Sequence, residues 1–277
     1  MRRMTAFAAL ALAAAPVPAG AQPQPAAPAV SAEAFAAALA NANRDADRAR
    51  DQFRHPAETL AFFRVGPDMK VGEYAPAGGW YSRVLGNYLS PRGKLVGLYS
   101  MPEEGVRDAA AAAKIRADAA AFAGQVQAWT GRPVAQTGGL SLDAVTAADK
   151  GSFDRIVVMR MMHNLMAGNV ADSELKAMRD LLKPGGMLGI EQHRAKEGAP
   201  GDYTDGGKGY LRQKDVIGLV EAMGFELVAA SEINANPRDT ADHPEGVWEM
   251  KPSWRTKRAE LENLGESDRM TLLFRKR

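Results

Sequence analysis

An acidic residue followed by a turn of small residues is the clearest candidate ligand site in this chain. Glu73 ends a short apolar segment, and a helical stretch begins near Trp80. Between them lie the small residues Ala75, Ala77, Gly78 and Gly79. Small side chains let a ligand approach the main chain, and the first N–H groups of a following helix attract negative charge. We therefore expect a small anionic or carboxylate-bearing ligand at this turn.

Two histidines, His163 and His193, each come a few residues after an apolar segment. Ligands bind at the carboxyl ends of strands in open α/β sheets, and the ordinary pKa of histidine suits a general base. We expect His163 to take a proton from a substrate that Asn164, Trp80 and His193 also contact. Structural roles remain open for these residues: core packing for His163 and Trp80, and a helix cap for Asn164.

Strand and helix patterns alternate from residue 69 onward. The predicted strands are 70–73, 94–98, 134–136, 153–159, 187–191, 226–232 and 271–274. The predicted helices are 81–89, 105–129, 173–182 and 214–223, after a helical stretch at 31–63, and the glycine-rich segment 198–209 is a candidate lid. The alternation predicts an α/β fold with a doubly wound, mostly parallel sheet. No crossover helix precedes the last strand, so we expect it to run antiparallel.

Three segments, in this order, carry a resemblance to a known family. They are 71–80 (VGEYAPAGGW), 153–165 (FDRIVVMRMMHNL) and 181–188 (LLKPGGML). Together they resemble the class I S-adenosylmethionine-dependent methyltransferases, over about residues 56–277. More narrowly, the chain resembles a group of predicted methyltransferases that often carry signal peptides, through its P-x-G-G-W turn, its His-Asn pair and its N-P-x-D segment at 236–239.

The resemblance implies a Rossmann-like methyltransferase sheet, flanked by N-terminal helices, that binds S-adenosylmethionine. It implies that Glu73 helps to hold the amino group of this cofactor, while the turn at 75–79 lies along its methionyl part. Ala75 and Ala77 stand where the family often has glycine, and a left-handed conformation there would cost about 1 kcal/mol. Tyr99 replaces the acid that usually binds the ribose hydroxyls, and could form one hydrogen bond or stack on adenine. Leu140 is a candidate for the adenine edge.

The first residues of the chain are typical of a cleavable secretory signal. Two arginines precede a short apolar stretch, and AGA at 19–21 forms a cleavage site. We expect a signal peptide at 1–21, a disordered linker at 22–30 and one α/β domain at 31–277 with a helical extension at 31–64. The protein is then exported, to the periplasm, or cytoplasmic if the signal is not used. The apolar stretch is too short to span a bilayer, so no stable membrane insertion is expected.

The composition narrows the classes of function. The 277 residues carry a formal charge of only +2, which gives no reason to expect a nucleic-acid partner. Cysteine is absent and the four histidines lack the short spacings of zinc sites, so no metal is expected. A nicotinamide-dependent oxidoreductase is disfavoured because the first turn lacks G-x-G-x-x-G.

Two functions remain open at this point. One is S-adenosylmethionine-dependent methyl transfer to a small-molecule acceptor. The other is a non-catalytic exported protein with this fold that binds another small molecule or a protein partner. The sequence leaves the acceptor and the oligomeric state open.

Overall fold

The computed structural model describes residues 30–102 and 108–277. The predicted signal peptide lies outside these residues. So do residues 22–29 of the predicted linker and residues 105–107 of the predicted helix at 105–129. No helix in the described part of the chain is both long and apolar enough to cross a bilayer.

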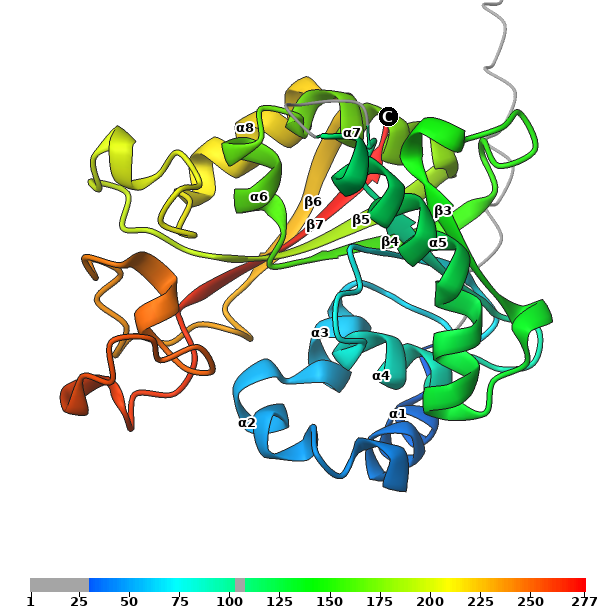
Figure 1. Ribbon diagram of the computed structural model, residues 1–277, viewed down its shortest axis with the longest axis horizontal. Helices are drawn as coiled ribbons and strands as arrows, with labels where there is room; N and C mark the ends of the chain where they lie inside the picture. The colour runs from blue at the N-terminus through cyan, green and yellow to red at the C-terminus, as the bar shows by residue number, and fades with distance from the viewer. Residues whose placement is uncertain (1–29, 103–107) are drawn as a thin grey trace, which may run out of the picture.

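A seven-stranded sheet runs through the centre of the protein in the spatial order β3-β2-β1-β4-β5-β7-β6 (Figure 1). The strands are β1 (Lys70–Tyr74), β2 (Lys94–Tyr99), β3 (Thr137–Ser141), β4 (Phe153–Met159), β5 (Leu182–His193), β6 (Phe225–Ser231) and β7 (Arg269–Lys276). Every pair is parallel except those that β7 forms with β5 and β6. This confirms the predicted fold class, a doubly wound Rossmann-like sheet with an antiparallel C-terminal strand.

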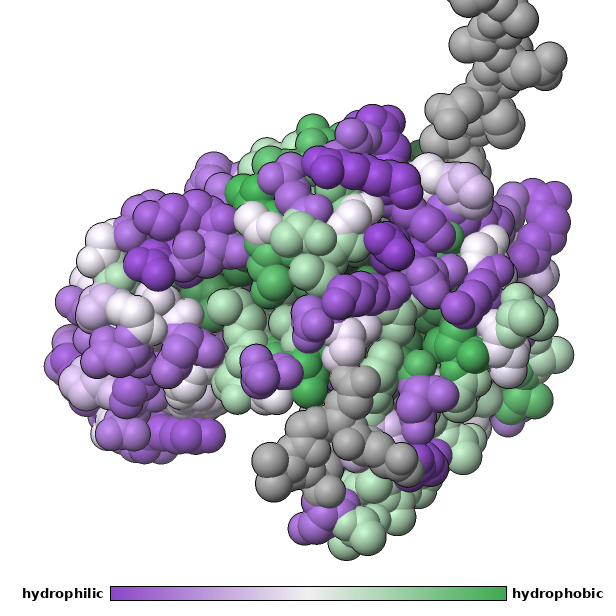
Figure 2. Space-filling model, turned by 90° about the horizontal axis from the view of Figure 1, so that it is seen from above, coloured by the Kyte–Doolittle hydropathy of each residue, from purple (hydrophilic) through white to green (hydrophobic). Residues whose placement is uncertain are grey.

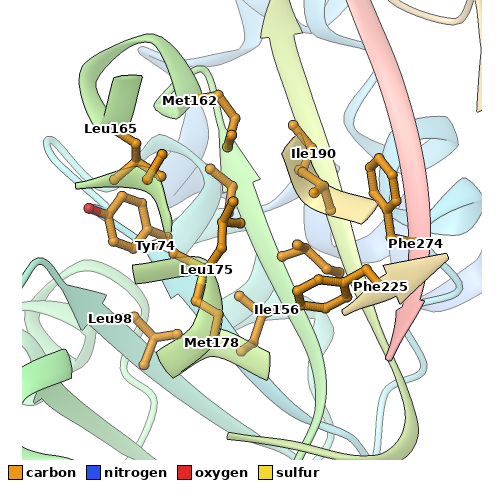
Figure 3. Packing of buried hydrophobic residues seen from close by; sticks show 14 of the residues in the cluster. Tyr74, Leu98, Ile156, Met162, Leu165, Leu175, Met178, Ile190, Phe225 and Phe274 are labelled. Atoms are coloured by element: carbon orange, nitrogen blue, oxygen red, sulfur yellow. The ribbon is translucent and has the colours of Figure 1, made fainter. Parts of the chain in front are cut away.

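Helices cover both faces of this sheet (Figure 1). The helices are α1 (Ala32–Ala40), α2 (Asp51–Arg54), α3 (Pro56–Phe62), α4 (Trp80–Tyr88), α5 (Ala109–Thr130), α6 (Met162–Ala167), α7 (Ala171–Leu181) and α8 (Gln213–Ala222). Side chains of α1, α3, α4 and α5 pack in one hydrophobic cluster, and those of α6, α7 and α8 pack in another on the opposite face. In Figure 3, Leu175 and Met178 of α7 lie beside Ile156 of β4.

The N-terminal helices are tied to the sheet layer through α4. Ser31 caps α1, as its side chain accepts a hydrogen bond from the backbone N–H of Ala34 at 3.1 Å. The ring of Phe35 in α1 stacks on Tyr88 of α4 with 3.7 Å between ring centroids. Pro56 begins α3 at the first helical position, which suits its fixed φ. This packing holds the short helix α2 near the carboxyl ends of the strands.

The third strand does not lie where the sequence predicts it. Residues Val134–Gln136 form a 3-10 helix, and β3 begins only at Thr137. Gly138 and Gly139 of β3 are residues more typical of a loop, because glycine has a low strand propensity. Glycine is nevertheless required, since a Cβ on Gly139 would lie 1.8 Å from the carbonyl oxygen of Ala119 in α5. The close approach of α5 therefore requires glycine at this position of β3, and the strand is not recognisable from propensity alone.

The fifth strand is longer than the predicted 187–191. It starts at Leu182, which pairs with Phe153, and regular pairing resumes at Met187 after an irregularity. Between them the Pro-Gly-Gly segment bulges, with Gly185 at a φ of 71°.

Hydrophilic residues cover most of the face seen in Figure 2, with hydrophobic patches between them. Within residues 30–102 and 108–277, Val30 and Val134 are the exposed large hydrophobic residues.

Candidate functional site

A cavity of about 460 Å³ opens where β1 and β4 end. We call it the β1–β4 cavity. Its lining includes Glu73 from β1, Met159 from β4 and His193 from β5, with Arg54 from α2 and Trp248 from the loop between β6 and β7 on other walls. In Figure 1 that loop, drawn in orange, and α2, drawn in blue, lie beyond the same end of the sheet.

A second cavity, also about 460 Å³, lies beside the end of β2. This β2 cavity is lined by Tyr99, Ser100 and Asp118, among others. The two cavities share the lining residues Tyr74, Ala75, Ala77, Met161 and Asn164. They therefore form one bipartite site on either side of the turn that follows β1.

The turn after β1 has a strained backbone. Ala75 and Ala77 have φ angles of 47° and 49°, in the left-handed region that disfavours any residue with a Cβ. Gly79 also has a positive φ, 74°, and a Cβ there would lie 2.3 Å from the ring of Trp129. By contrast, a Cβ on Gly78 would meet nothing within 4 Å. Gly78 thus presents bare main chain to the β1–β4 cavity, and strain of this kind gathers at ligand sites.

Glu73 is a buried acid at the edge of this cavity. Its side chain is 3% exposed, and its Oε2 accepts a hydrogen bond from the Ser82 hydroxyl at 2.6 Å. Burial raises the pKa of Glu73 to about 8. A cationic ligand group beside it would supply the charge partner that the carboxylate lacks.

Trp80 both packs and lines the β1–β4 cavity. It begins α4, is 8% exposed and meets Tyr81 edge-on at 4.7 Å between ring centroids. The guanidinium of Arg54 lies 4.6 Å from the centroid of its ring. The two interpretations of Trp80 are therefore compatible, because the side chain belongs to the core and still forms part of the cavity wall.

His163 and His193 stand side by side in the β1–β4 cavity, with 5.6 Å between ring centroids. Burial lowers the pKa of His163. Burial also lowers the pKa of His193 well below 6.5, and the neighbouring His163 and Arg269 lower it further. Near neutral pH both rings are therefore uncharged, as a general base requires. His193 Nδ1 lies 2.6 Å from the Ser267 hydroxyl.

The remaining predicted residues fall in different places. Asn164, in α6, is exposed and lines both cavities. Tyr99 lines the β2 cavity and meets Phe122 edge-on at 6.3 Å between ring centroids. Leu140 lies within β3 rather than after it, and it lines neither cavity but packs against the core.

Sequence reasoning missed several residues that line these cavities. Asp118 of α5 faces the β2 cavity, and Arg160 and Trp248 face the β1–β4 cavity. Arg160 directly follows β4, has a φ of 57° and could have been noticed as a charge ending a buried strand. Nothing in the sequence indicates Trp248, because a long irregular loop brings it there.

The candidate lid at residues 198–209 does not line the β1–β4 cavity. Instead Ala199 and Tyr203 pack with Ala241 and Trp248 of the next loop.

Across the described residues, no group of three or more histidines or acids is placed to hold a metal ion.

Comparison with known proteins finds distant structural likenesses. No family model and no curated protein matches the chain. A solved methyltransferase from Aquifex aeolicus, described as SAM dependent, is 12% identical, with a TM-score of 0.49 over 83% of this chain and 94% of that one. A chain from a Haloferax volcanii complex, formed by the Trm112 methyltransferase activator and a putative methyltransferase, is 13% identical. Its TM-score is 0.49 over 90% of this chain and 99% of that one. The [4+2]-cyclase SpnF is 16% identical, with a TM-score of 0.48 over 80% of each chain.

The strand order and the two adjoining cavities define this chain as a Rossmann-like α/β protein with a candidate ligand site at the ends of β1, β2 and β4. Likenesses this distant do not imply a shared reaction. The side chains of the site must therefore carry the functional conclusion.

Proposed function

We propose that the protein transfers a methyl group from S-adenosylmethionine to a small-molecule acceptor. The observation that carries this proposal is the bipartite site, in which one cavity flanks the turn after β1 and the other flanks the end of β2. Such a pair of cavities suits a ligand with an amino-acid part and a nucleoside part. The turn between them offers bare main chain at Gly78.

The residues present fit this cofactor in character. Glu73, buried and without a cationic partner at hydrogen-bond distance, suits the cofactor's ammonium group. Tyr99 offers its ring and hydroxyl in the β2 cavity, where Asp118 supplies the carboxylate that the end of β2 lacks. We infer that Asp118, from α5, takes the place of the acid that usually binds ribose. When bound, the cofactor supplies an activated methyl group on a sulfonium sulfur.

His163 is the base in this proposal. Its uncharged ring faces the β1–β4 cavity, where it would accept the proton that an acceptor hydroxyl or acidic carbon loses as it is methylated. Trp80 and Trp248 form apolar parts of the same wall and limit the access of water. Holding both reactants in one geometry supplies most of the expected rate enhancement.

Calorimetric titration of the purified protein with S-adenosylmethionine and S-adenosylhomocysteine tests the proposal. We expect micromolar binding that Glu73→Gln weakens for both ligands, since both carry the ammonium group. Glu58→Gln, at an exposed position of α3, is the matched control and leaves the affinity unchanged. If neither ligand binds at millimolar concentration, the proposal fails, and a non-catalytic protein that binds another ligand becomes the better account.

We also propose that the protein is exported to the periplasm, on the basis of the signal-like pattern at 1–21. Fractionation of cells that express the full chain, followed by mass measurement of its N-terminus, tests this. A mature N-terminus at Gln22 in the periplasmic fraction supports export. An intact Met1 in the cytoplasmic fraction contradicts it.

A further inference from the structure

A cluster of buried charges beside the β1–β4 cavity is not used by the function proposed above. It consists of four arginines and two glutamates, namely Arg50, Arg54, Arg160, Arg269, Glu191 and Glu266. The side chains of Glu191, Arg269, Arg54 and Glu266 are at most 4% exposed. Arg50, Arg54, Arg160 and Glu266 line the cavity directly.

The two carboxylates are shared among the four guanidinium groups. Glu266 lies 2.6 Å from Arg50 Nε, 3.1 Å from Arg54 Nε and 2.8 Å from Arg269 Nη1. Glu191 lies 3.0 Å from Arg269 Nε and 3.3 Å from Arg160 Nη1. Three buried atoms of the cluster form no hydrogen bond, namely Arg50 Nη2, Arg269 Nε and Glu191 Oε1. Four guanidinium groups share two carboxylates, so the cluster has more positive charge than its own acids balance, which is costly in a buried place.

Other acids that line the cavity do not supply the missing charge. Asp47 pairs with Arg83, 2.5 Å from its Nε and 2.8 Å from its Nη2. Glu73 is mainly protonated near neutral pH because burial raises its pKa to about 8. Lys251 adds a further cation to the lining. Among the described lining residues, the balance of charge is therefore positive.

The methyl donor cannot correct this balance. S-adenosylmethionine carries one carboxylate, one ammonium and one sulfonium group, so its amino-acid part has a net charge of about +1 near neutral pH. Glu73 releases its proton when it binds the ammonium group, which offsets the charge of the cofactor and leaves the excess of positive charge at the arginines as it was. The compensating negative charge must come with the other ligand.

We propose that the methyl acceptor is a small organic oxyanion, either a carboxylate or a phosphate ester, and that Arg54 and Arg160 bind its charged group. The inference rests on the proposed methyl transfer. Guanidinium groups bind both oxyanions through paired N–H donors. Arg54 is held over the ring of Trp80, 4.6 Å from its centroid, and Arg160 is fixed at the end of β4.

This placement also accounts for the position of the base. His163 lies three residues beyond Arg160, in the first turn of α6, and its ring meets Trp248 edge-on at 6.2 Å. An anionic group held by Arg160 leaves the rest of the acceptor beside the imidazole and the indole. The arginines are thus positioning residues, and His163 is the group that meets the reacting atom.

Matched pairs of charged and neutral probes test the inference. The purified protein is titrated by calorimetry with 4-hydroxybenzoate against 4-hydroxybenzamide, and with phenyl phosphate against phenol, first alone and then saturated with S-adenosylhomocysteine. We expect an anion to bind at least about tenfold more tightly than its neutral partner. The pair that shows the larger preference identifies the oxyanion as carboxylate or phosphate.

Arginine variants assign the preference to this cluster. Arg160→Gln should reduce it to about twofold or less, and Arg160→Lys should retain part of it. Arg54→Gln, at the other arginine of the proposed anion site, is the second test if Arg160→Gln does not fold. Arg92→Gln, on an exposed arginine paired with Asp68, is the control and keeps the full preference.

The outcomes separate this inference from the proposed function. Binding of S-adenosylhomocysteine without any preference for anions at millimolar concentration overturns the inference alone. An anion preference without binding of S-adenosylhomocysteine overturns the proposed function and retains the oxyanion site. A preference that survives in Arg160→Gln and Arg54→Gln places the anion elsewhere and also overturns the inference.

Discussion

The side-chain amide of Gln192 orients the imidazole of His163. Gln192 Nε2 donates to the carbonyl oxygen of Gly209 at 2.8 Å, so its Oε1 must face the other way. That oxygen lies 3.4 Å from both the backbone nitrogen and Nδ1 of His163. Because Oε1 can only accept, we infer that Nδ1 carries the proton and that Nε2 keeps the lone pair a base needs.

The first prediction concerns this tautomer. Nitrogen-15 chemical shifts of His163, assigned with His163→Gln, should show the Nδ1–H form near neutral pH and protonation only below pH 6.5, because burial lowers its pKa. Gln192→Leu removes the acceptor and should give a mixture of tautomers, while the shifts of exposed backbone sites stay unchanged. A dominant Nε2–H form in the wild type contradicts the assignment.

The second prediction uses the open space above Gly78. Since a Cβ there meets nothing within 4 Å, Gly78→Leu should leave the melting temperature nearly unchanged while its side chain fills part of the β1–β4 cavity. S-adenosylhomocysteine should then bind at least about tenfold more weakly, measured by calorimetry. Gly218→Leu, an equally open position on α8, is the control and should bind normally. Equal affinity of both variants would remove Gly78 from the ligand site.

The third prediction concerns the neighbouring glycine. Gly79→Ala places a Cβ 2.3 Å from the Trp129 ring at a φ of 74°, so we expect a loss of about 2 kcal/mol or more in the free energy of unfolding. Gly78→Ala, one residue earlier, should cost less than about 0.5 kcal/mol. Urea denaturation of both variants measures the difference, and similar stabilities would contradict the geometry of this turn.

The fourth prediction is a pH dependence. The pKa of Glu73 is raised from 4.5 to about 8 in the folded protein, so the folded state holds a proton that the unfolded state releases. The contribution of this proton is fully present below about pH 4.5 and is lost as the pH rises toward 8. Glu73→Gln should therefore become more stable relative to wild type over that range, measured by urea denaturation. A constant difference across this range would argue against a protonated Glu73.

The fifth prediction tests the replacement of the missing ribose acid. Asp118→Asn should weaken binding of S-adenosylhomocysteine by about tenfold, since a neutral amide forms weaker hydrogen bonds to hydroxyl groups. Adenosine, which has the ribose and no amino-acid part, should lose affinity by the same factor. Asp118 pairs with Lys114 at 2.6 Å, so Lys114→Gln controls for loss of that ion pair. An Asp118→Asn protein that binds both ligands normally would exclude this role.

Much of the fold could be predicted from local patterns. The parallel sheet, the antiparallel last strand and the cap at Ser31 follow from alternating apolar segments, a missing crossover helix and a hydroxyl before an alanine-rich helix. The bounds of β5 and the place of β3 were exceptions. β3 was missed because its Gly139 allows the close approach of α5, a contact between residues far apart in the chain.

The sequence by itself determined which residues follow the ends of the strands, and so it pointed to Glu73 and His163. Strand ends meet at one edge of a parallel sheet, which makes such residues readable from their order. Only the tertiary structure decided that Asp118 and Tyr99 line the same cavity, and that Arg54, Arg160 and two glutamates form one charge cluster. These contacts join helices and loops that lie far apart in the chain. The net charge of the cluster depends on which side chains pack together, and no local sequence pattern predicts that.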